Sequence, residues 1–139
     1  RDSVIMVEVV REVSESWREF AAAVDMRIAL EMDGHPTRRC RVGDAIVMRV
    51  ALAAGYEDGD VLWVCLPHCL SRIVGGAQVK DFSVDFGGHH EVSVHLAATS
   101  PTIDVEGSLR PQRFAVCLRN MFVEERAANP GWIDITVTA

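Results

Sequence analysis

Chemically active side chains gather most densely between Cys65 and Cys69, where two cysteines flank a leucine, a proline and His68. Thiolate and imidazole are preferred zinc ligands, but a closed zinc site takes four ligands, and its Cys-x2-4-Cys pair normally recurs elsewhere in the chain. No second pair of this spacing occurs, so the other ligands would have to come from distant strands. We therefore expect Cys65 to be a small core residue and His68 to lie in a surface loop.

A second group of potential ligands consists of His89 and His90, which follow a Gly-Gly pair, and of His95. Paired histidines at a hairpin tip can bind a metal ion or respond to pH, although a polar turn is the commoner explanation. The alternation around His95 predicts that it faces solvent. We predict no metal site. A metal-dependent enzyme or sensor is the third-ranked interpretation, and its candidate residues are Cys65, His68, Cys69, His89 and His90.

The sequence contains no recognisable catalytic motif. A G-x-S-x-G nucleophile elbow, a P-loop and a G-x-G-x-x-G fingerprint are all absent. Nothing orients any of the four cysteines toward a general base, and their spacing matches no disulfide framework, so their redox state stays open. We predict a protein that is not an enzyme, with no catalytic residue and no cofactor.

The segment 120–131 combines apolar and charged side chains ahead of an Asn-Pro-Gly turn of the type II pattern. In one interpretation Met121 and Phe122 pack into the end of the sandwich, and the charged side chains of the segment face solvent. In the other, the segment contacts a partner, because exposed Phe and Met beside charges are typical of an interface core and rim. The candidate partner-binding residues are Met121, Phe122, Glu124, Glu125 and Arg126.

Short blocks in which apolar and polar residues alternate must position these side chains. In residues 24–32, for example, Val24, Met26, Ile28 and Leu30 share one face, as in a half-buried antiparallel strand. Turn residues such as Asp33-Gly34 separate the blocks. The predicted strands are residues 3–13, 24–32, 45–53, 61–66, 81–86, 90–96, 113–119 and 133–139.

This spacing, without intervening helical patterns, predicts one domain over residues 1–139. We expect an all-β, immunoglobulin-like antiparallel sandwich of seven to nine strands. Ser16 and Glu19 form a capping-box pattern, so at most one short helix is expected, near residues 16–23.

Composition narrows the classes of partner. The 139 residues carry 14 basic and 20 acidic side chains, a net charge of −6, which argues against nucleic-acid binding because phosphates need a basic surface. No apolar run approaches the length that spans a bilayer, so membrane insertion is not expected. The remaining classes are a protein partner or neighbouring domains, with a homo-oligomer as an alternative.

The order of several short motifs resembles a macroglobulin-type β-sandwich domain of bacterial α2-macroglobulin-like proteins. The motifs are Asp-Gly at 33–34, Val-Gly-Asp at 42–44, Leu-Pro-x-x-Leu at 66–70, Ala-Thr-x-Pro at 98–101, and the Met-aromatic, acidic and Arg segment at 121–126. The resemblance implies a supporting domain of a large protease-trapping protein, in an extracellular or cell-envelope location. The chain lacks the Cys-Gly-Glu-Gln thioester sequence, so it is not expected to be the reactive domain.

The sequence thus predicts a non-catalytic binding or scaffolding module that contacts its partner through a strand edge and the 120–131 segment. The alternative is a β-sandwich subunit of a larger assembly, such as a shell, virion or secretion component, that oligomerises through strand edges.

Overall fold

The computed structural model describes residues 25–54, 58–120 and 131–139, and these residues form strands and connecting loops without a helix. The strands are β1 (Asp25–Met32), β2 (His35–Pro36), β3 (Arg39–Arg41), β4 (Ala45–Ala54), β5 (Asp60–Cys65), β6 (Leu70–Val74), β7 (Ala77–Val79), β8 (Asp81–Asp85), β9 (Glu91–Ala98), β10 (Gln112–Asn120) and β11 (Gly131–Thr138). No helix long and apolar enough to cross a membrane occurs in this described part.

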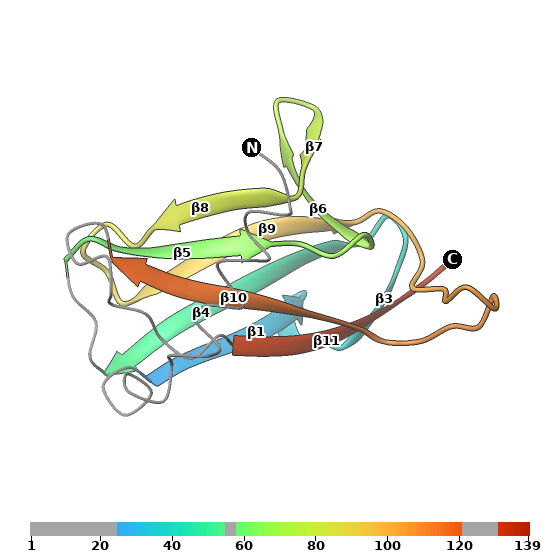
Figure 1. Cartoon of the computed structure of the whole chain (residues 1–139), viewed down its shortest axis with the longest axis horizontal. Helices are drawn as coiled ribbons and strands as arrows, with labels where there is room; N and C mark the ends of the chain where they lie inside the picture. Colours follow the sequence, from blue (N-terminus) through green and yellow to red (C-terminus); the bar gives the residue numbers. More distant parts are fainter. Residues whose placement is uncertain (1–24, 55–57, 121–130) are drawn as a thin grey trace.

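The strands form two layers (Figure 1). The first sheet has the order β2-β1-β4-β9-β6-β7, and the second has the order β3-β11-β10-β5-β8. Neighbouring strands are antiparallel except β3 and β11, which pair in parallel. The β6–β7 hairpin projects beyond the two layers, at the top of Figure 1.

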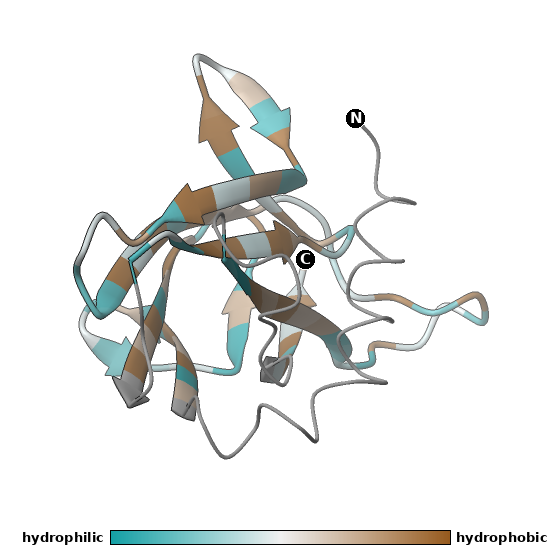
Figure 2. Ribbon diagram, turned by 60° about the vertical axis from the view of Figure 1, so that its left-hand side comes forward, coloured by the Kyte–Doolittle hydropathy of each residue, from teal (hydrophilic) through white to brown (hydrophobic). Residues whose placement is uncertain are grey.

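The core lies between the two layers and is built from the apolar face of each strand. Met48, Val50, Leu62 and Val116 are completely buried there. Brown and teal segments alternate along the strands in Figure 2, as the period-two pattern requires. Burial of such side chains is the main favourable term for folding, about 1.5–3 kcal/mol for each large aliphatic residue.

Turn chemistry sets the register of the first hairpin. Asp33 and Gly34 have φ values of 53° and 78°, which suit the two central positions of a type I′ turn. Met32 therefore pairs with His35 directly across the turn.

The predicted all-β sandwich is confirmed, and its described part contains eleven strands where seven to nine were expected. Four of the eleven strands are not among the predicted ones: β2, β3 and β7 have two or three residues each, too few to show alternation, and β6 has five residues. The expected loop between β1 and β4 holds two of them. The predicted strand 3–13 and short helix near 16–23 lie outside the described residues, and the single domain over 1–139 stays a prediction.

Candidate partner-binding surface

The sequence-predicted partner residues, Met121, Phe122, Glu124, Glu125 and Arg126, lie outside the described part of the chain. The structure does describe the strand end that precedes them. Asn120 is buried there, and its Nδ2 donates hydrogen bonds to Oδ1 of Asp60 at 2.8 Å and to the backbone oxygen of Asp58 at 2.9 Å. This contact joins the end of β10 to the start of β5.

The Cys65–Cys69 segment does not form a ligand cluster. Cys69 is completely buried in the core, whereas Cys65 is half-buried on the opposite face of the second sheet. The expectation that Cys65 is a core residue is therefore wrong, because alternation along β5 gives the core-facing positions to Leu62 and Val64. His68 is exposed in the loop between the two cysteines, as predicted.

The other histidines lie away from this segment. His89 and His90 are exposed in the turn after β8, close to where β5 begins, because β8 runs antiparallel to β5 with Asp85 opposite Val61. His95 faces solvent on the outer face of the first sheet, as expected. Within the described ranges, no three His, Cys, Asp or Glu side chains are placed to hold a metal ion.

Lys80, the chain's single lysine, fixes the loop that carries His68. Its ammonium group donates hydrogen bonds to the backbone oxygens of His68 at 2.9 Å and Leu70 at 2.6 Å, and lies 3.4 Å from that of Pro67. Burial lowers the pKa of this lysine from its ordinary value. These hydrogen bonds hold the loop between β5 and β6 against Lys80.

A cleft of about 490 Å³ opens beside His68. Its remaining walls come from both ends of the connection between β9 and β10, which we call the 99–111 loop, and from the start of β10. Hydrogen bonds tie the loop to its surroundings: the Ser100 hydroxyl donates to the backbone oxygen of His68 at 3.0 Å, and the Thr102 N–H donates to that of Val137 at 2.9 Å. The side chains around the cleft are His68, Pro101, Thr102, Ile103, Asp104, Arg110, Pro111, Gln112 and Arg113.

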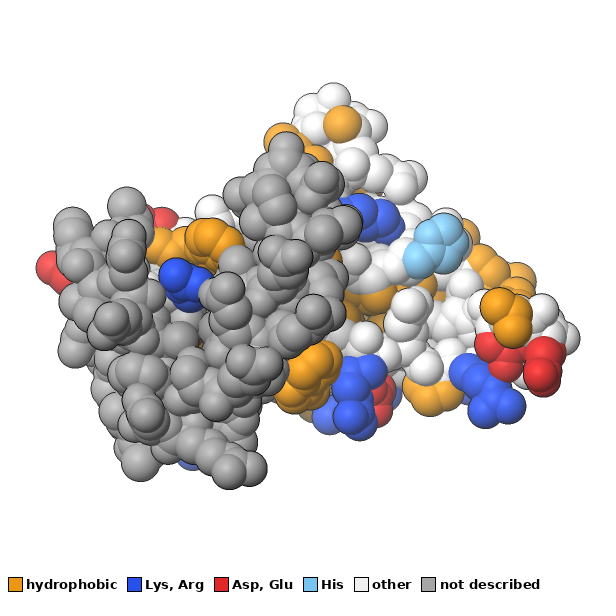
Figure 3. All heavy atoms as spheres, in the orientation of Figure 1, with side chains coloured by type: hydrophobic (Ala, Val, Ile, Leu, Met, Phe, Trp, Pro, Cys, Tyr) orange, Lys and Arg blue, Asp and Glu red, His pale blue; other side chains and the backbone are white. Residues whose placement is uncertain are grey.

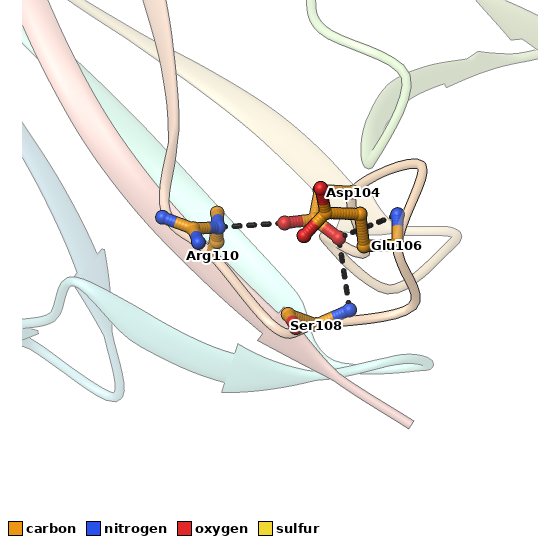
Figure 4. A network of polar contacts seen from close by, with 4 residues as sticks. All are labelled: Asp104, Glu106, Ser108 and Arg110. Atoms are coloured by element: carbon orange, nitrogen blue, oxygen red, sulfur yellow. Dashed lines mark hydrogen bonds and ion pairs between the residues drawn. The ribbon is translucent and has the colours of Figure 1, made fainter.

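Asp104 organises the 99–111 loop (Figure 4). Its Oδ1 accepts hydrogen bonds from the backbone N–H groups of Glu106 and Ser108, both at 2.9 Å, and its Oδ2 lies 2.6 Å from Nε of Arg110. The hydrogen bond from Ser108 is the largest of several contacts that hold the pKa of Asp104 below its ordinary value. The carboxylate thus closes the loop from within, as Asx turns do.

Three apolar side chains point outward from this ordered loop. Val105 is fully exposed at the tip, and Ile103 and Leu109, which form a β-bridge with each other, are 53% and 42% exposed. A second exposed pair, Ile73 and Val74, lies on the β6–β7 hairpin. Figure 3 shows apolar side chains at both projections, on the hairpin at the top and on the loop at the right.

In sequence, residues 100–108 carry mainly turn signals, Ser100-Pro101 and Glu106-Gly107-Ser108. The available signal was the order Asp104, Val105, Glu106, Gly107, which places an apolar residue inside a turn sequence where polar residues are usual.

Comparisons with known proteins give little beyond this geometry. No family model matches the chain, and no curated protein matches it in sequence. Among solved structures it is similar to the CARDB domain of the PF1109 protein from Pyrococcus furiosus, crystallised in complex with di-metal ions, at 12% sequence identity. That match covers 83% of this chain and 94% of the other, with a TM-score of 0.37.

Proposed function

We propose that this domain is a non-catalytic binding or scaffolding module and that the 99–111 loop contacts its protein partner. The observation that carries the proposal is the display of Ile103, Val105 and Leu109 on a loop that hydrogen bonds hold in one shape. Exposed apolar side chains that cluster on a surface are typical of protein contacts. A loop ordered before binding also loses less conformational entropy when the partner docks.

The cleft beside the loop favours a partner that offers acidic or hydroxyl groups next to an apolar patch. Arg110, Arg113 and His68 line the cleft, although the chain as a whole is acidic. Arg110 contacts Asp104 and Arg113 contacts Asp134 at 3.0 Å, so both guanidinium groups are held in place. Each guanidinium has five N–H donors, which leaves donors for a partner carboxylate.

The finer form of the proposal is a supporting domain of a protease-trapping, macroglobulin-like protein. In that form the neighbouring domains of the same protein are the partner, and Met121, Phe122, Glu124, Glu125 and Arg126 extend the contact. Its support is the order of sequence motifs, together with the absence of the thioester sequence from this chain.

The experiment replaces Val105 with a photo-crosslinking phenylalanine analogue in the native host and identifies the adducts by mass spectrometry. A matched control carries the analogue at Ser83, an exposed residue of β8. We expect one protein, or one neighbouring domain, to be crosslinked from position 105 and not from position 83. Equal adducts from both positions, or none from either, would contradict the proposal.

The alternative is a subunit of an assembly that pairs through strand edges. The exposed Ile73 and Val74 of β6 favour it, because they pair with β7, the edge strand of the first sheet, in the hairpin that projects beyond the two layers. The edge strand β8 of the second sheet points against it, since Asp81 and Asp85 would repel a second copy of the same strand. A closed oligomer, seen by light scattering and dissociated by Ile73→Asp, would establish this alternative.

A further inference from the structure

Arginine side chains concentrate where β3, β11 and the start of β10 lie side by side in the second sheet. Cys40 of β3 faces the core, so Arg39 and Arg41 on either side of it face outward. Arg113 of β10 lies on the same outer face, opposite Asp134 of β11. We call the exposed arginines of this area the arginine patch: Arg38, Arg39, Arg41 and Arg113.

The arginine patch is basic although the chain as a whole carries a net charge of −6. The β11 residues opposite Arg39 and Arg41 are threonines, and neither is charged. The acid on this face of β11 is Asp134, whose Oδ1 accepts a hydrogen bond from Nε of Arg113 at 3.0 Å. That hydrogen bond is the largest cause that holds the pKa of Asp134 below its ordinary value, and the nearby charge of Arg38 adds to it.

The guanidinium groups of Arg39 and Arg41 differ from the other arginine of a sheet face, Arg49. Arg49 of the first sheet lies 2.7 Å from Glu91 and 3.5 Å from Glu31. Within the described ranges, no carboxylate lies at ion-pair distance from Arg39 or Arg41. Two like charges on one short strand repel each other, and an anionic ligand would remove this repulsion.

The edge of β3 is closed to a further strand. The Thr37 hydroxyl donates to the backbone oxygen of Arg39 at 2.8 Å and accepts its N–H at 3.3 Å. Asp44 occupies the backbone groups of Arg41 in the same way, with its Oδ2 2.9 Å from the Arg41 nitrogen and its own N–H donating to the Arg41 oxygen at 3.0 Å. A ligand of the arginine patch therefore binds through side chains and not by extending the sheet.

The spacing of the arginines fits an acidic peptide in the extended conformation. Arg39 and Arg41 are two residues apart in a strand, so their side chains leave the sheet about 7 Å from each other. An extended peptide with an acid at every second position presents its carboxylates on one side at the same spacing. Guanidinium groups bind carboxylates through two parallel hydrogen bonds, which makes arginine suited to this contact.

The arginine patch leads into the cleft beside the 99–111 loop. Arg113 belongs to the patch and also lines the cleft, together with Arg110 and His68. Figure 3 shows basic side chains near β11 and again at the 99–111 loop, on the lower right of the molecule. A peptide that crosses the patch toward Arg113 therefore arrives at the loop that displays Val105.

We propose that the outer face of β3, β11 and the start of β10 binds an extended acidic peptide segment, whose carboxylates contact Arg39 and Arg41 and whose chain passes Arg113 to the cleft. The inference rests on the proposed function, because it assigns the chemical class of the partner's contact. A nucleic acid longer than the patch would have to continue over the acidic remainder of the surface, which a short peptide avoids.

The test measures binding of a fluorescein-labelled peptide of alternating glutamate and threonine to the purified full-length chain, by fluorescence anisotropy. Threonine favours extended backbone, so the probe presents glutamates on one side. A peptide of alternating glutamine and threonine and an oligothymidylate of similar length serve as comparison probes. We expect the glutamate peptide to bind and the glutamine peptide not to bind, with the oligothymidylate weaker than the glutamate peptide.

Three variants locate the contact. The double substitution Arg39→Gln and Arg41→Gln is expected to weaken binding of the glutamate peptide about tenfold, because it removes two charge-assisted contacts. Asp134→Asn is expected to strengthen binding about threefold, since it removes the carboxylate that competes for Arg113. Arg49→Gln is the matched control: it removes the same charge from the first sheet and leaves the affinity unchanged.

A glutamate peptide that does not bind the unaltered chain overturns the proposal. Equal weakening by the double substitution and by Arg49→Gln, or tighter binding of oligothymidylate than of the peptide, overturns it as well. If circular dichroism shows that the double variant is unfolded, Asp134→Asn decides, because unfolding does not produce a gain of affinity. The crosslinking result is separate: a peptide that binds without a crosslink from position 105 contradicts only the loop contact, and a crosslink without peptide binding contradicts only the arginine patch.

Discussion

Asp104 shows how much of a loop's shape can depend on one side chain. The carboxylate accepts backbone hydrogen bonds from Glu106 and Ser108 and pairs with Arg110, so it closes the turn and also holds a wall of the cleft. The Asp104-Val105-Glu106-Gly107 sequence predicts a turn, but only the structure shows that the Val105 side chain is exposed to solvent and not buried.

We predict that Asp104→Asn lowers the melting temperature at pH 7 but not in strong acid. The folded-state pKa of Asp104 lies below its unfolded value, so its ionised form stabilises the fold above the unfolded pKa of about 3.9. That contribution is lost as the pH falls through the folded-state pKa. Melting temperatures of the two proteins from pH 7 to pH 2 should therefore approach each other as the pH falls below about 4 and meet below the folded-state pKa, whereas Glu106→Gln, at an exposed acid of the same loop, should match the unaltered chain at pH 7. A difference that persists unchanged at pH 2 would contradict the ionic role.

At the scale of strands, a buried hydrogen bond joins the start of β5 to the end of β10. Asp60 and Asn120 are 1% and 5% exposed, and the Asn120 amide donates to the Asp60 carboxylate. A buried carboxylate without donors is costly, so this pair sets the register in which the two central strands meet.

We expect Asn120→Leu to lower the free energy of unfolding by about 1–3 kcal/mol, because it removes a donor from a buried acceptor. Urea denaturation monitored by tryptophan fluorescence measures the change. Gln112→Leu, at the other end of β10, serves as the control and should change stability by less than about 0.5 kcal/mol. Equal effects of the two substitutions would mean that the Asp60–Asn120 contact contributes nothing specific.

The strands differ in how far the sequence predicts them. β1, β4 and β9 show alternation over eight or more residues, and their core faces follow directly from it, whereas β10 is apolar and buried at every position from Phe114 to Leu118. β3 has three residues and pairs with β11 in parallel, so its partner is distant in the sequence and no local pattern reveals it. The candidate surface was harder still to predict, because Ile103 and Leu109 meet only through a bridge across the loop.

For the whole molecule, charge is distributed unevenly. The chain has a net charge of −6, yet the cleft is bordered by two arginines and a histidine. The net charge disfavours the approach of acidic molecules at long range, whereas the two arginines beside Asp104 offer an acidic group of a partner local hydrogen-bond donors at the cleft.

We predict that the double substitution Glu124→Lys and Glu125→Lys weakens association with the partner crosslinked from position 105 by about tenfold, without unfolding the domain. Calorimetric titration measures the affinity, and circular dichroism checks the fold. Asp85→Lys, an exposed acid on β8, controls for the change in net charge. Equal weakening by the control would indicate a general charge effect and remove the 120–131 segment from the contact.

The parallel pairing of β3 with β11 has a consequence for folding. The Thr138 hydroxyl donates to the backbone oxygen of Cys40, across 98 residues of chain, and β11 lies between β3 and β10 in its sheet. The second sheet therefore cannot be completed until residues 131–138 have been synthesised and have left the ribosome. The apolar residues of β10 therefore lack one neighbouring strand until β11 has been synthesised, so this domain is expected to complete its folding slowly and only after β11 has left the ribosome.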